Sequence, residues 1–208
     1  MALPTYNVEE PRLTLKLGEQ RNLFKLFLSN VGLQASQYAV NTAFDLLNGK
    51  TEINYGAIFE NFAAQELRAH GYSLYYFNSK WQGKLDFVVE DRGHVLPIEI
   101  KSGKDYKRHN ALSNVMATPE YDIPRAVVFS NGNLEVIGKI TDCPIFMLIY
   151  LQYQAMTDPI FRSKPMYSLA SLLPVAYGTE YLRHKFNVVK KFAKKFLLLE
   201  NITNFVTE

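Results

Sequence analysis

The stretch that decides the fold is KLDFVVEDRGHVLPIEIK, residues 84–101, because it reads as two β-strands joined by a tight turn. Apolar side chains recur at every second position on both sides of the centre, which is typical of strands with one face in a core. Arg92 and Gly93 stand between the runs, where they can form the two-residue loop of a hairpin. A turn at these residues pairs Asp91 with His94, and the strand register follows from that pair.

This register predicts that three charged side chains share one face of the hairpin. Asp86 falls opposite Glu99, and Lys101 lies two residues beyond Glu99 on the same face. Two carboxylates about 5 Å apart repel by roughly 3 kcal/mol at an effective dielectric constant of about 20. A divalent cation changes the sign of that energy, because carboxylate oxygens are the ligands that Mg²⁺ prefers.

Lys101 would then stand beside the metal, where it lowers the pKa of an attacking water or stabilises a pentacovalent phosphate. We therefore predict that Asp86, Glu99 and Lys101 are the catalytic residues of a phosphodiester hydrolase that uses Mg²⁺ or Mn²⁺. The alternative is a solvated salt-bridge patch on an ordinary hairpin, worth about 0–1 kcal/mol.

The flanking segments predict an α-β-β-β-α-β order. Gly71 directly follows a helix expected over residues 57–70, at the position where a residue with left-handed backbone conformation often ends a helix. The expected elements are a helix over residues 57–70, strands over 72–77, 84–90 and 95–101, a helix over 106–116, a strand over 125–130 and a candidate strand over 145–150. Before them, helix-like apolar spacing from residue 24 onward predicts short helices.

Glu60 lies near the start of the first helix, at the border of its apolar face. The helix dipole favours an anion there, so Glu60 is a candidate fourth member of the site. The alternative is a surface glutamate that the dipole stabilises.

Four runs of the chain resemble a known family: GAIFENFAAQEL (56–67), LYYF (74–77), LDFVVE (85–90) and PIEIKSG (97–103). They are similar to the C-terminal domain of unknown function found on many archaeal and bacterial AAA-type ATPases, itself similar to PD-(D/E)XK nucleases. The resemblance covers roughly residues 24–151. It implies a restriction-endonuclease-like core, in which helices flank a central mixed sheet.

The resemblance also implies roles for individual residues. Glu60, Asp86 and Glu99 correspond to acidic metal ligands, the carbonyl of Ile100 to a further ligand and Lys101 to a catalytic lysine. The expected function is metal-dependent hydrolysis of DNA. The alternative is a catalytically inactive interaction or regulatory module of an AAA-type ATPase.

Basic residues near the hairpin are candidates for nucleic-acid binding. Lys84 falls opposite Lys101 in the predicted register, where two lysines would repel each other or bind a phosphate together. Lys104, Lys107 and Arg108 could follow a nucleic-acid backbone. The alternative is a solvated helix face.

Composition bounds the class of protein. The chain has 208 residues, 48% of them hydrophobic, which is enough for one main core. Cys143 is the single cysteine, so no internal disulfide can form. The sequence shows neither a leader peptide nor an apolar run of about 18 residues, so we expect a cytoplasmic protein that does not cross a membrane.

Three regions are expected along the chain. Residues 1–56 read as an N-terminal arm with short helices that pack on the core, and residues 57–151 as the nuclease-like core. Residues 152–208 read as a C-terminal appendage with a basic amphipathic helix near its end.

Overall fold

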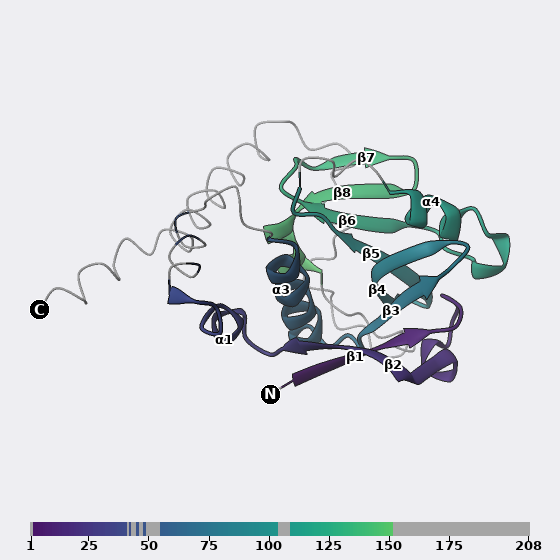
Figure 1. Cartoon of the computed structure of the whole chain (residues 1–208). Coiled ribbons are helices and arrows are strands. Elements are labelled where there is room, and N and C mark those ends of the chain that lie inside the picture. The colour runs from purple at the N-terminus through teal and green to yellow at the C-terminus, as the bar shows by residue number, and fades with distance from the viewer. Residues whose placement is uncertain are drawn as a thin grey trace, which may run out of the picture. The chain divides into compact units, whose positions relative to one another are not determined.

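One eight-stranded mixed β-sheet organises the computed structural model (Figure 1). The structure describes residues 2–40, 55–103 and 109–151, together with Thr42, Asp45 and Asn48. These residues all belong to the first of the two units into which the chain divides, Met1–Pro165 and Met166–Glu208. The strands are β1 (Ala2–Val8), β2 (Glu19–Leu28), β3 (Tyr75–Ser79), β4 (Gly83–Asp91), β5 (His94–Ile100), β6 (Ala126–Ser130), β7 (Glu135–Ile137) and β8 (Ile140–Pro144). Their order across the sheet is β2-β1-β3-β4-β5-β6-β8-β7.

The β4–β5 hairpin has the predicted register. Asp91 pairs with His94, and the antiparallel ladder runs from there back to Phe87 and Ile98. Arg92 and Gly93 both have positive φ, at 52° and 76°. A type I′ turn requires positive φ at both of its central residues, so the turn at this pair is confirmed.

The predicted order of elements around the hairpin is also present. Helix α3 (Gly56–Ala69) precedes β3, and α4 (Asn110–Met116) lies between β5 and β6, which gives α-β-β-β-α-β. Gly71 follows α3 with a φ of 93°. The Tyr72 N–H donates to Leu67 O, a bond that closes the last turn of the helix as the predicted glycine cap requires.

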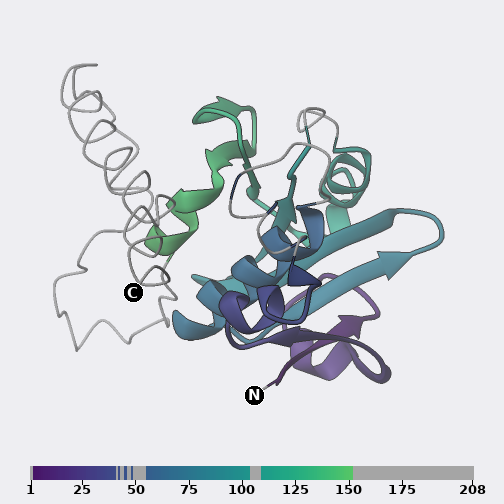
Figure 2. The same ribbon diagram turned by 60° about the vertical axis from the view of Figure 1, so that its left-hand side comes forward.

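The core has two parts. Around α4, apolar side chains from the helix pack on residues of the central strands, among them Leu112, Val115, Val88 and Val128. Around α3, which packs against β2 and β5, the Phe27 and Phe87 rings lie 5.4 Å apart. The short helix α1 (Val31–Ala35) lies beside α3 (Figure 2).

Two predictions about local structure were wrong. Residues 24–28 belong to strand β2 and not to a helix, so the N-terminal segment is part of the sheet. Residues 145–150 form the 3-10 helix η3 (Ile145–Tyr150) and not a strand. Pro144 is the last paired residue of β8, and its missing N–H stops the ladder there.

The remaining short elements are the 3-10 helices η1 (Leu15–Gly18) and η2 (Pro119–Tyr121). Within the described residues, every helix is too short or too polar to cross a lipid bilayer.

Candidate functional site

Strand β4 carries an extra residue at the predicted site. Tyr75 of β3 pairs with Val88, whereas Phe77 pairs with Leu85, so two steps along β3 correspond to three along β4. The additional residue creates a β-bulge around Asp86. Bulges re-aim side chains and are common next to functional sites.

The bulge turns the Asp86 carboxylate toward the end of β5. Asp86 is buried, and its Oδ2 accepts a hydrogen bond of 3.0 Å from the Ile100 N–H. Its Oδ1 lies 3.4 Å from Lys84 Nζ. The β4–β5 ladder ends at Phe87 and Ile98, so the oppositions predicted beyond it, Asp86 to Glu99 and Lys84 to Lys101, are not ladder pairs. Beyond Phe87 and Ile98, the Ile100 N–H therefore donates to the side chain of Asp86.

Glu99 has the most buried side chain among the acids of the site. Its side chain is 7% exposed, and Oε1 lies 2.6 Å from Lys101 Nζ. The other oxygen, Oε2, is buried and has no hydrogen-bond partner among the described residues. Burial and the charge of Asp86 raise the pKa of Glu99, and Lys101 offsets only part of that rise. Asp86 and Glu99 are therefore close enough for the charge of Asp86 to oppose the ionisation of Glu99.

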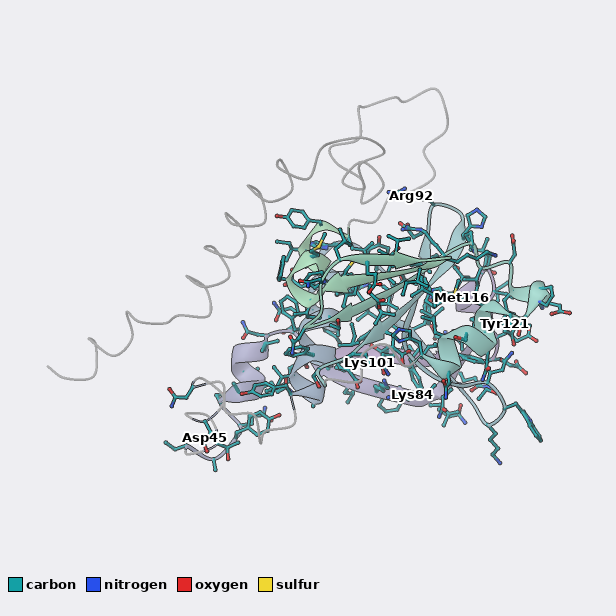
Figure 3. The ribbon with its side chains drawn as sticks, turned by 90° about the horizontal axis from the view of Figure 1, so that it is seen from above. Asp45, Lys84, Arg92, Lys101, Met116 and Tyr121 are labelled. Atoms are coloured by element: carbon teal, nitrogen blue, oxygen red, sulfur yellow. The ribbon has the colours of Figure 1, made fainter. Side chains whose placement is uncertain are left out.

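Two lysines carry positive charge to the Asp86 side of the site. Partial burial lowers the pKa of Lys84, but the carboxylates of Asp86 and Glu60 raise it overall. Lys25 Nζ lies 3.3 Å from Glu60 Oε2, and burial lowers the pKa of Lys25 despite that partner. The positive charges of Lys101 and Lys84, both labelled in Figure 3, each lower the pKa of Glu99.

Lys25 is not among the site residues predicted from the sequence, because the sequence predicts helices from residue 24 onward and not a strand. In a strand, Lys25 and Phe27 share a face, and Phe27 is buried. That alternation was the signal that could have placed Lys25 beside Glu60.

The structure therefore gathers three acids and three lysines whose formal charges cancel. They are Glu60, Asp86, Glu99, Lys25, Lys84 and Lys101. In the described ranges, no three side chains of histidine, cysteine, aspartate or glutamate are grouped to hold a metal ion. Glu60 as a third metal ligand stays a prediction.

Two carboxylates are nevertheless enough for Mg²⁺, which usually keeps several waters. A cation could coordinate Glu99 Oε2, which is buried and has no hydrogen-bond partner in the part of the chain that the structure describes. Asp86 and the Ile100 carbonyl stand at the same end of the hairpin. The donor set fits a divalent cation held by two acids.

A second polar pair lies further across the sheet. Val128 pairs with both Glu99 and Asp142 on its two sides, which puts the two acids in one row. His109 Nε2 lies 3.7 Å from Asp142 Oδ1. Burial lowers the pKa of His109, Asp142 partly offsets this, and Lys101 lowers it further. The sequence offered no signal for this pair, because the row depends on parallel pairing between distant strands.

Of the four predicted nucleic-acid contacts, Lys84 alone is described, with a side chain 45% exposed. Lys104, Lys107 and Arg108 lie outside the described residues.

Comparison with known proteins matches a segment of the chain, residues 55–146, to a family model. Neither a curated protein nor a solved structure matches the chain. The matched segment begins directly before α3 and ends in η3, so it contains Glu60, Asp86, Glu99 and Lys101 but not Lys25. Residues 55–146 match the model of a family described as a domain of unknown function, DUF4143.

Proposed function

We propose that the site hydrolyses phosphodiester bonds of DNA with the help of a divalent cation, as the resemblance to PD-(D/E)XK nucleases suggests. One observation carries the proposal: a buried glutamate, Glu99, keeps one oxygen without a hydrogen-bond partner among the described residues, next to a second acid, Asp86. An arrangement that served stability alone would pair or solvate that oxygen.

Asp86, Glu99 and the carbonyl of Ile100 are the groups that would hold the cation. When bound, Mg²⁺ lowers the pKa of a water ligand and neutralises charge on phosphate. The six charged groups of the site cancel, so a bound cation would leave a net charge of about +2, which attracts a phosphate backbone.

The chain's own lysines complete the chemistry. Lys101 is 30% exposed beside the buried Glu99, so its ammonium reaches both the acid and an incoming substrate. It would donate a hydrogen bond to the attacking water or to a phosphate oxygen while the P–O bond breaks. The neighbouring carboxylates raise the pKa of Lys84, which keeps its charge available for phosphate binding.

The test is cleavage of supercoiled and branched DNA in Mg²⁺ and in Mn²⁺. Wild type should cut, and Lys101→Ala should reduce the rate by at least about 100-fold, as expected for the loss of a charged group that acts in the transition state. Lys139→Ala is the matched control, because Lys139 is an exposed lysine in the turn between β7 and β8. Equal rates for wild type and Lys101→Ala would contradict the proposal.

A second candidate is a non-catalytic module that docks on an AAA-type ATPase. The cancellation of charge within the site favours it, because such a cluster is tolerable without a metal. On this account the wild-type protein binds no Mn²⁺ at millimolar concentration and cuts no DNA. Metal binding that depends on Asp86 would exclude this candidate.

A further inference from the structure

The turn between β3 and β4 presents the single tryptophan of the chain to solvent. Trp81 is 92% exposed, although tryptophan is highly buried on average in folded proteins. A ring that lies in water contributes little to the core and is free to contact an external partner.

The backbone beneath Trp81 is fixed, so the ring is presented from a firm base. Gln82, the next residue, donates from Nε2 to Thr118 Oγ1 at 3.0 Å and accepts at Oε1 from Tyr121 OH at 3.0 Å. Gly83 packs so tightly that an added Cβ would lie 2.8 Å from Ala111 Cβ. The turn is thus fastened to the region of α4 and η2, beside which it lies in Figure 1.

Charge indicates what the ring would meet. In the sequence, Lys80 directly precedes Trp81 and Lys84 follows it by three residues. Both lysines are exposed, and the stretch NSKWQGK (78–84) contains no acid. An exposed aromatic between cations suits a base that stacks while its phosphates meet the lysines.

Distance links the turn to the candidate active site. Strand β4 begins at Gly83, directly after the turn, and carries Asp86, whose Oδ1 lies 3.4 Å from Lys84 Nζ. Trp81 and Asp86 are five steps apart along the chain, which is at most roughly 17 Å of extended backbone. At the rise of ~3.4 Å per nucleotide along one strand of a duplex, this distance spans at most about five nucleotides, and fewer of an extended single strand.

We propose that Trp81, with Lys80 and Lys84, binds single-stranded nucleic acid by stacking on an unpaired base a few nucleotides from the point of cleavage. This rests on the proposed nuclease function for the link to cleavage, but the binding itself requires no hydrolysis. The substrate class would be single-stranded DNA, or DNA with an unpaired segment such as a branch.

Because Trp81 is the only tryptophan, its fluorescence reports the contact directly. The probe is an oligothymidylate, titrated in EDTA so that no cleavage occurs. Saturable quenching in wild type, and about 5- to 150-fold weaker binding by Trp81→Ala in an anisotropy assay, are expected from the loss of one stacked base. Trp81→Phe should keep most of the affinity, and Leu17→Ala, which alters another exposed apolar residue, should keep all of it.

Three results would overturn the inference: no quenching by the oligonucleotide, equal quenching by heparin, which has charge but no bases, or wild-type affinity in Trp81→Ala. The first would leave Trp81 to a protein contact. If the oligonucleotide quenches Trp81 in wild type but wild type cuts no DNA, the nuclease function alone is refuted. If wild type and Trp81→Ala both cut branched DNA with the same KM, the stacking contact alone is refuted.

Discussion

The hydrogen bond from Ile100 N–H to Asp86 should make Asp86 a structural residue as well as a metal ligand. Asp86→Ala leaves this buried N–H unpaired, and a hydrogen bond to a charged acceptor contributes about 1.5–3 kcal/mol. Loss of the half-exposed pair with Lys84 adds about 0–1 kcal/mol. Relief of the repulsion on Glu99 offsets part of this cost.

The sum is a loss of about 2 kcal/mol for Asp86→Ala, or roughly 4–8 °C in Tm for a domain of this size. Asp86→Asn keeps an oxygen that can accept from Ile100 N–H, so it should lose less than about 1 kcal/mol. Urea denaturation followed by circular dichroism measures both values.

Glu120→Ala is the control for removal of an exposed acid and should change stability by less than about 0.5 kcal/mol. The reasoning is refuted if Asp86→Ala matches wild type, or if Asp86→Asn is destabilised as much as Asp86→Ala.

Three further predictions concern the surroundings of the site. The pKa of Glu99 is raised above 4.5 in the folded state, so the metal-free protein should lose stability as pH rises through that raised pKa. Thermal melts recorded across this pH range should show the loss in wild type and not in Glu99→Gln. Gly83→Ala should lower the free energy of unfolding by about 2–4 kcal/mol, because φ is +94° and the new Cβ meets Ala111. Gly138→Ala, with φ of +60° and open space around it, should lower it by about 1–2 kcal/mol. Equal losses for the two variants in urea titrations would contradict the contact with Ala111. Burial, together with Asp142, raises the pKa of Cys143 to about 12. Its thiol should therefore react with a disulfide reagent near pH 8 only after the protein unfolds. Rapid labelling of the folded protein would contradict this burial.

The hairpin shows how much of the fold could be predicted from local pattern. Alternation and the Arg92-Gly93 turn fixed the β4–β5 register, because both are properties of neighbouring residues. The bulge at Asp86 could not be predicted in this way, since it arises from how β4 meets β3 as well as β5. Asp86 therefore accepts a hydrogen bond from the Ile100 N–H and does not pair with Glu99 in the ladder.

The other failures have the same origin in long-range pairing. Lys25 joins the site only because β2 is the outer strand beside β1, which pairs in parallel with β3. Asp142, with its partner His109, lies in the same row of the sheet as Glu99 only because β6 lies between β5 and β8. No periodicity within a segment encodes those neighbours. The predicted appendage, residues 152–208, lies outside the described residues.

The central claim is that Asp86 and Glu99 together hold a divalent cation. Calorimetric titration of Mn²⁺ into wild type, Asp86→Asn and Glu120→Ala tests it most directly, because Asp86→Asn should retain the fold. We predict saturable binding to wild type and to Glu120→Ala, and a loss of binding in Asp86→Asn. Equal affinity in all three proteins, or no binding to wild type, would contradict the claim.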